Sequence, residues 1–191
     1  MDMATGKLIV ISAPSGSGKS SIIKEVIKDK QLHLEFSISA TTRPPRAGEL
    51  NGRDYYFMSV DDFKKKISNH EFAEYQEVYP GRFYGTLKSE IQRIMADGDN
   101  VILDVDVQGG VNVKNMYGDR AVSIFIKAPS VEVLRQRLHG RGTDSDEEIE
   151  KRVSKAEYEL TFAHKFDHIV VNDSLPDAIG NVRRVIQDFI G

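Results

Sequence analysis

A run of glycines and serines ending in a lysine has the residue types and spacing of a phosphate-binding loop. The run is Ala13-Pro14-Ser15-Gly16-Ser17-Gly18-Lys19-Ser20, followed by Ser21, and it nearly fits the pattern G-x-x-x-x-G-K-[ST]. In this pattern backbone N–H groups surround a phosphate, the lysine reaches the β- and γ-oxygens, and the last hydroxyl contacts Mg²⁺. Ala13 replaces the first glycine of the pattern. The methyl group of alanine is tolerated at this position if φ there is negative. We predict an ATP-binding P-loop here, in preference to an ordinary Gly/Ser turn.

Two arginines further along offer a second phosphate site. Arg43 and Arg46 flank two prolines, which hold the segment extended and lower the entropy lost on ordering it. Guanidinium groups match phosphate oxygens, and Tyr55 and Tyr84 could donate hydrogen bonds to the same anion. The alternative is a solvated basic loop beside two packed tyrosines. A P-loop kinase needs a place for its phosphate acceptor, and this segment supplies one.

Two acids and three arginines complete the candidate chemistry. Asp104 and Asp106 stand two residues apart after an apolar run, so they point to one face at the carboxyl end of a predicted strand. One could approach Mg²⁺ through water while the other meets a base, or both could be strand-end caps. Arg137, Arg141 and Arg152 could stabilise a transferring phosphoryl group, or form surface ion pairs.

The elements that must position these residues alternate between strand and helix. Apolar runs at 8–12, 101–105, 122–127 and 168–172 predict strands, and the intervening segments are long enough for helices. This order predicts an α/β fold with a parallel sheet covered on both faces. Residues 37–86 interrupt this alternation of strands and helices. They predict an inserted acceptor-binding subdomain with one helix at 60–68. Residues 140–163 predict a lid containing a charged helix, which leaves a core of about 1–36, 87–139 and 164–191.

The composition excludes several classes of protein. The 191 residues contain no cysteine, which rules out thiol catalysis, disulfide scaffolds and cysteine-ligated zinc. The net charge of −3 argues against electrostatic binding of nucleic acid by the chain as a whole. No apolar stretch is long enough to span a membrane, so we expect a cytoplasmic protein with no membrane or nucleic-acid partner. Oligomeric state is not predicted.

With these motifs in order, the chain resembles the guanylate kinase family over nearly its whole length. The matching pieces are the P-loop, 39–46, 48–55, 71–74, 84–86, 103–109, 137–143 and 169–173. The resemblance implies a P-loop NTPase-type sheet with an inserted GMP-binding subdomain and a lid. It also implies transfer of the γ-phosphoryl group of ATP to GMP, and also to dGMP, with Mg²⁺ as cofactor.

The resemblance further assigns roles to single residues. Glu74 and Asp106 would read the N1–H and N2–H₂ donors of guanine, a pair that adenine lacks, with help from the hydroxyls of Ser39 and Thr86. The acceptor phosphate would be held by Arg43, Arg46, Tyr55 and Tyr84. Lys19, Arg137, Arg141 and Arg152 would be catalytic, Asn172 would lie near the adenine of ATP, and Ser20 and Asp104 would serve the metal, Asp104 through water.

Two other functions stay open at this point. A kinase for another nucleoside monophosphate would share the P-loop and lid but would not require Glu74 and Asp106. A noncatalytic guanylate-kinase-like module would bind a protein in the acceptor cleft, although such modules usually have an eroded P-loop and this chain has Gly16, Gly18 and Lys19. The spacing of His164 and His168 alone does not predict a zinc site, because no third ligand is evident.

Overall fold

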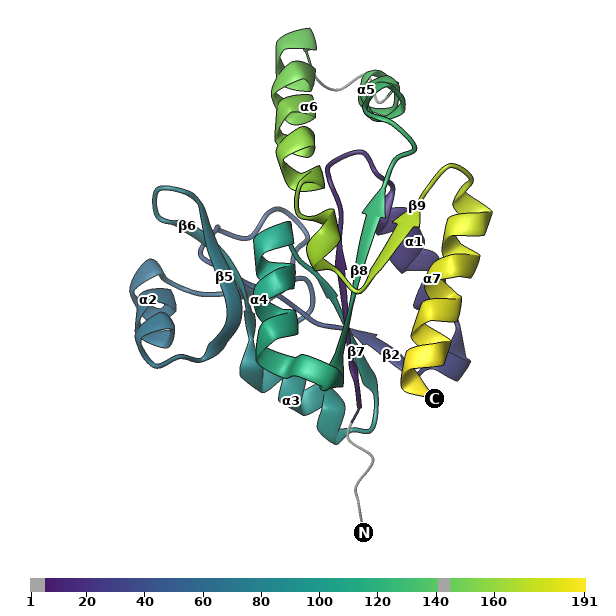
Figure 1. The fold of residues 1–191 in the computed structure, drawn as a ribbon. Helices are drawn as coiled ribbons and strands as arrows, with labels where there is room; N and C mark the ends of the chain where they lie inside the picture. The colour runs from purple at the N-terminus through teal and green to yellow at the C-terminus, as the bar shows by residue number, and fades with distance from the viewer. Residues whose placement is uncertain (1–5, 141–144) are drawn as a thin grey trace.

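The computed structural model describes residues 6–140 and 145–191, and a five-stranded parallel sheet forms the centre of this part (Figure 1). The strand order is β2-β7-β1-β8-β9. The strands are β1 (Leu8–Ser12), β2 (Leu34–Phe36), β7 (Asn100–Asp104), β8 (Ala121–Lys127) and β9 (His168–Val171). Because neighbouring strands run parallel, their carboxyl ends share one edge, where an α/β fold binds its ligands.

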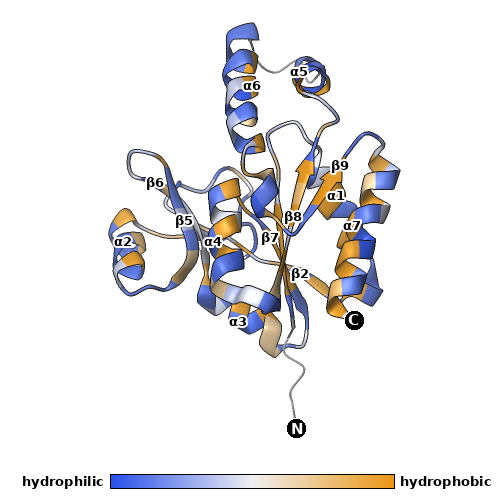
Figure 2. Cartoon of the chain, viewed as in Figure 1, coloured by the Kyte–Doolittle hydropathy of each residue, from blue (hydrophilic) through white to orange (hydrophobic). Residues whose placement is uncertain are grey.

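Helices cover both faces of this core sheet. Ile9 and Ile11 of β1 point to the face covered by α1 (Lys19–Val26) and α7 (Leu175–Ile190). Leu8 and Val10 point to the other face, which packs against α3 (Lys88–Ala96) and α4 (Val107–Tyr117). Figure 2 shows the hydrophobic strands enclosed between these helices. The central strands are mostly apolar because both of their faces are buried, which confirms the predicted α/β class.

A second, smaller sheet lies beside the core. Its order is β4-β3-β6-β5, formed by β3 (Ala40–Thr41), β4 (Tyr56–Phe57), β5 (Phe72–Tyr79) and β6 (Arg82–Leu87). The chain turns between β5 and β6 at Gly81, whose φ of 74° suits glycine. Helix α2 (Val60–Ser68) places Phe63 in a small aromatic core, stacked on Phe72 and Phe83. The sheet therefore has its own hydrophobic support and is not an irregular loop.

Helices α5 (Val131–His139) and α6 (Asp146–Leu160) project beyond the carboxyl edge of the core sheet (Figure 1). Ser145 and Glu148 form a capping box that starts α6. Leu134 and Leu138 of α5 pack against Ile149 and Val153 of α6 in a separate apolar cluster. The pair is thus held together by its own contacts, away from the main core.

A short 3₁₀ turn separates the helix after the P-loop from β2. Helix α1 ends at Val26, and the 3₁₀ turn η1 (Lys30–Leu32) follows it. Asp29 explains the break, because its carboxylate accepts a hydrogen bond from the backbone N–H of Gln31 and caps the new turn. The remaining short elements are η2 (Gly118–Arg120) and η3 (Ala163–Lys165). Among the described residues, no helix combines the length and apolarity that crossing a bilayer requires.

Candidate active site

The P-loop joins β1 to α1 at the carboxyl edge of the core sheet. Gly18 has a φ of 89°, and a Cβ added there would lie 2.3 Å from Nδ2 of Asn172, so both backbone and space require glycine. The same Nδ2 donates a hydrogen bond of 2.8 Å to the carbonyl of Ser17. Ala13 is not among the residues with positive φ, so the methyl group in place of glycine is tolerated. Asn172 thus holds the backbone of the loop through this hydrogen bond. It is not among the residues that line the cavity above the loop.

A cavity of about 370 Å³ opens above this loop. It is lined by residues 13–21, by Asp104, Val105 and Asp106, and by Glu159 of α6. Lys19 forms an ion pair with Asp104, so the lysine and the predicted metal-side acid already face the same space. The N-terminus of α1 adds its partial positive charge. The cavity combines backbone donors, a cation and a hydroxyl, Ser20, which suits a polyphosphate.

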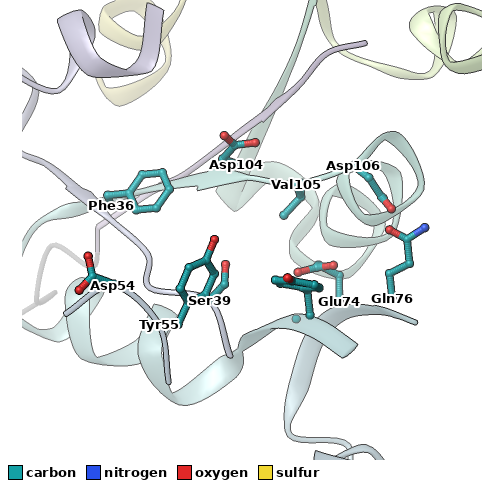
Figure 3. Close-up of a pocket in the computed structure, with 11 residues that line it drawn as sticks. Phe36, Ser39, Asp54, Tyr55, Glu74, Gln76, Asp104, Val105 and Asp106 are labelled. Atoms are coloured by element: carbon teal, nitrogen blue, oxygen red, sulfur yellow. The ribbon is translucent and has the colours of Figure 1, made fainter. Parts of the chain in front are cut away.

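A second cavity, of about 310 Å³, lies between the two sheets. In Figure 3 the side chains of Ser39, Tyr55 and Glu74 lie on one side of it, and Asp104 and Asp106 lie on the other. Its lining is Phe36, Ser39, Asp54, Tyr55, Glu74, Gln76, Tyr84, Gly85, Asp104, Val105 and Asp106. The two cavities share residues 104–106, so ligands in them would meet at the end of β7.

Glu74 is the most perturbed acid of the second cavity. Burial raises its pKa to about 7, a hydrogen bond from Thr86 opposes the rise, and the negative charge of Asp106 adds to it. The Thr86 hydroxyl lies 2.7 Å from Oε1 of Glu74. An ionised carboxylate only accepts hydrogen bonds, so Thr86 is the donor and its proton is committed to Glu74. Thr86 therefore orients the carboxylate, and its hydroxyl keeps only an acceptor role toward a ligand.

Asp106 serves as the N-cap of α4, with Oδ1 accepting a hydrogen bond of 2.6 Å from the backbone N–H of Gly109. Asp106 is therefore a cap, although it caps the start of helix α4 and not the end of the strand. It uses one carboxylate oxygen, and the residue still lines both cavities. A Cβ on Gly109 would come within 3.0 Å of Oε2 of Glu74 and 3.2 Å of Oδ1 of Asp106, so glycine lets the two acids approach each other.

The arginine segment is only partly arranged around the second cavity. Arg43 is buried and pairs with Glu49 through two hydrogen bonds of 2.9 Å, and this carboxylate raises the pKa of Arg43. Its guanidinium also lies over the ring of Tyr55, which packs edge-on against Tyr84 with ring centroids 6.1 Å apart. Arg46 is exposed, and its backbone N–H donates to Glu49. Neither arginine side chain lines the cavity itself.

Two of the three predicted catalytic arginines lie on the projecting helices. Arg137 of α5 donates hydrogen bonds to the carbonyls of Asn172, at 2.9 Å, and Asp173, at 3.5 Å, which ties α5 to the end of β9. Arg152 is half-buried on α6. Arg141 lies outside the described residues. Neither Arg137 nor Arg152 lines the P-loop cavity in this arrangement.

Sequence reasoning missed three polar residues of the site. Glu159 is buried and lines the P-loop cavity, and its burial raises its pKa, which Lys155 and Lys19 oppose. Gln76 lies beside Glu74 and Asp106 in Figure 3. Glu49 holds Arg43. Gln76 could have been found, since it stands two residues after Glu74 and so shares its strand face. Glu159 carried no such signal among the many acids of α6.

The residues present fit a hydrated magnesium ion. No group of three metal-binding side chains occurs among residues 6–140 and 145–191. Mg²⁺ usually keeps several waters and takes only one or two protein ligands besides the substrate phosphates, so a dedicated cage is not required. Ser20 and Asp104 supply a hydroxyl and a carboxylate on the lining of the P-loop cavity.

Comparisons with known proteins agree with one another. The family model described as guanylate kinase matches residues 5–189. The chain is 55% identical to a guanylate kinase of Bacteroides fragilis over 97% of this chain and 90% of that protein. It is 54% identical to one of Porphyromonas gingivalis over 96% of this chain and 98% of that protein. A crystal structure of guanylate kinase from Anaplasma phagocytophilum superposes with a TM-score of 0.73 at 28% identity, covering 97% of this chain and 86% of that one.

Proposed function

Because this chain belongs to the guanylate kinase family, we propose that it transfers the γ-phosphoryl group of ATP to GMP, forming ADP and GDP. The observation that carries this proposal is the pair of cavities that meet at residues 104–106. One has the donors of a polyphosphate site, and the other has a buried carboxylate. Two nucleotides bound in them would bring donor and acceptor phosphates to the same edge of the core sheet.

Glu74 supports guanine as the base of the acceptor. Its carboxylate can accept from N1–H and N2–H₂ together, with Thr86 holding it in place. Adenine offers no such pair, so its binding would leave the half-buried carboxylate of Glu74 with no partner besides Thr86, which costs about 1 to 3 kcal/mol or more. Asp106 and Ser39 support the same reading from opposite sides of the cavity. None of these groups is assigned to the ribose, so we include dGMP among the acceptors.

Arg43, Arg46, Tyr55 and Tyr84 would hold the acceptor phosphate. Glu49 holds the guanidinium of the buried Arg43 in place against the ring of Tyr55. Tyr55 and Tyr84 both line the cavity and could donate their hydroxyls to one anion. Arg46 lies outside the lining and would have to swing inward. The part of the chain near residues 37–86 would then act as an acceptor-binding unit.

On the donor side, the P-loop amides and Lys19 would bind the β- and γ-phosphates. Lys19 would exchange its ion pair with Asp104 for the phosphates, which would leave Asp104 free to act on the metal side with Ser20. Bound Mg²⁺ neutralises charge on the phosphate oxygens. Arg137, Arg141 and Arg152 would reach the transferring group when the segment near 140–163 closes over the P-loop, and Asn172 would lie on the adenine side.

The transfer itself needs little covalent help from the protein. A phosphate monoester carries about 1.5 to 2 negative charges at neutral pH, so a GMP oxygen can attack without a general base. In-line attack breaks the bond between the γ-phosphorus and the β–γ bridging oxygen, which leaves with ADP. Positioning and positive charge therefore provide most of the catalysis. The absence of cysteine from the sequence suits this chemistry and a reducing cytoplasm, where we place the protein.

Assays of ADP formation with each nucleoside monophosphate test this function. We expect rapid ADP formation with GMP and far slower formation with AMP, UMP or dTMP. Equal or better turnover with another monophosphate would overturn the base assignment in favour of a different kinase. No binding of ATP by a folded sample in calorimetry would instead favour the noncatalytic module.

A further inference from the structure

A buried carboxylate that the proposed chemistry does not use lies in the first turn of α3. The side chain of Glu90 is only 2% exposed. Burying a carboxylate is costly unless hydrogen bonds and an opposite charge replace the water it loses. Its partners show which parts of the chain this group holds together.

Glu90 accepts hydrogen bonds from three residues. The Tyr56 hydroxyl lies 2.9 Å from Oε2, Arg93 contributes two bonds of 3.0 Å, and the backbone N–H of Ile38 lies 3.5 Å from Oε1. Arg93 also pairs with Glu35. Burial by itself raises the pKa of Glu90, but the bonds from Arg93 and Tyr56 hold the pKa below its ordinary value. The carboxylate is therefore ionised at neutral pH and fully engaged.

These partners come from both sheets and from both passages between them. Ile38 lies where the chain leaves β2 of the core sheet for β3 of the second sheet. Helix α3, which carries Glu90, begins at Lys88, directly after β6 returns from the second sheet. Tyr56 belongs to β4 of the second sheet, and Glu35 belongs to β2 of the core. One carboxylate thus touches each crossing and a strand of the second sheet, and Arg93 extends the contact to the core.

We infer that Glu90 is a positioning residue that joins the two crossings to β4 and so sets where the second sheet lies relative to the core. The second cavity, which we call the acceptor cavity, lies between the two sheets. It is lined by Ser39, Tyr55 and Glu74 on the side of the second sheet and by residues 104–106 on the side of the core. A small rotation at the crossings would therefore move the acceptor phosphate relative to the P-loop. Phosphoryl transfer is sensitive to displacements of about 1 Å. This inference rests on the proposed function, because it concerns the alignment of the two substrates.

The removal of one hydroxyl tests the inference with little damage. Tyr56→Phe deletes the tie between Glu90 and β4 but keeps the ring in its apolar cluster and leaves the Glu90–Arg93 pair intact. A Glu90→Ala change would be less informative, because it would leave Arg93 without its buried partner. The matched control is Tyr117→Phe, which removes the hydroxyl of a half-buried tyrosine at the far end of α4.

Steady-state kinetics of the full chain with both substrates, and thermal unfolding of each variant, give the readout. We expect Tyr56→Phe to lower kcat/KM for GMP about tenfold, with the KM for ATP unchanged. Tyr117→Phe should leave both kinetic constants at the wild-type values. Identical kinetics for the two variants, whatever their melting temperatures, would show that Glu90 only stabilises the fold. Wild-type protein that forms no ADP with GMP would instead refute the proposed function.

Discussion

Replacing Glu74 by glutamine should weaken GMP use and stabilise the protein at the same time. Glutamine keeps the size of the side chain but cannot ionise, and its amide nitrogen would face a donor of guanine. Loss of charge-assisted hydrogen bonds costs about 1.5 to 3 kcal/mol, and the unpaired donor adds to it. We therefore expect kcat/KM for GMP to fall by about 10² to 10³, with the KM for ATP unchanged.

The gain in stability follows from the pKa of Glu74. Its value of about 7 lies above the ordinary 4.5, so between these pH values the folded protein binds more protons than the unfolded chain. Stability from this group is thus present below pH 4.5 and is lost as pH rises to 7. At about 1.4 kcal/mol per pKa unit, the rise from 4.5 to about 7 means that ionised Glu74 costs at most about 3.5 kcal/mol above pH 7. Because glutamine keeps an oxygen that can accept from Thr86, Glu74→Gln should stabilise the protein by up to about 3 kcal/mol at pH 8.

Urea unfolding of the wild type and Glu74→Gln at pH 8 and pH 4.5 measures the effect on stability. Kinetics of the same two proteins at pH 8 measure the effect on GMP use. The control is Glu77→Gln on the same strand, which is exposed, lies outside the acceptor cavity and keeps an oxygen that can accept from Gly81. The stabilisation by Glu74→Gln should shrink sharply at pH 4.5. An equal change at both pH values, or unchanged kcat/KM for GMP, would refute the reasoning.

Three further changes probe single contacts. Lys19→Met should lower kcat by about 10² to 10³ with stability changed by no more than about 1 kcal/mol, measured by ADP formation and thermal unfolding. Asp106→Asn should preserve the α4 cap but lower kcat/KM for GMP about tenfold; unfolding without a kinetic change would reduce Asp106 to a cap. Glu159→Gln should lower the KM for ATP by up to about fivefold, because a carboxylate in the P-loop cavity repels phosphate; a higher KM would contradict this.

Local sequence signals predicted the core well because they act over short distances. The apolar run at Leu8–Ser12, the glycines of the P-loop and the capping box at Ser145 each produce their element through neighbouring residues. The helix Val60–Ser68 has the predicted bounds because Ser59 caps it. The long hairpin of β5 and β6 was not foreseen as such. Its strands depend on pairing with each other and with β3, which no local pattern contains.

The site shows the same division between local and distant causes. Asp104 and Asp106 could be placed on one strand end from their spacing alone. Other features of the site depend on tertiary contacts that no local pattern contains. They are the hydrogen bond from Thr86 to Glu74, the Arg43–Glu49 pair and the carboxylate of Glu159 in the P-loop cavity. Glu90 is the clearest case, because it looks like a surface acid of an amphipathic helix until Tyr56 and Arg93 are seen around it.

A competition experiment tests the central claim most directly. ATP and Mg²⁺ are mixed with equal concentrations of GMP, UMP and dTMP, and the GDP, UDP and dTDP formed early in the reaction are separated from ADP and quantified. The ratio of products gives the ratio of kcat/KM values among the acceptors. We predict that GDP exceeds each of the other newly formed acceptor diphosphates by at least about 10², as expected when a buried carboxylate reads the base. Comparable yields of UDP or dTDP, or no GDP above a control without protein, would contradict the account.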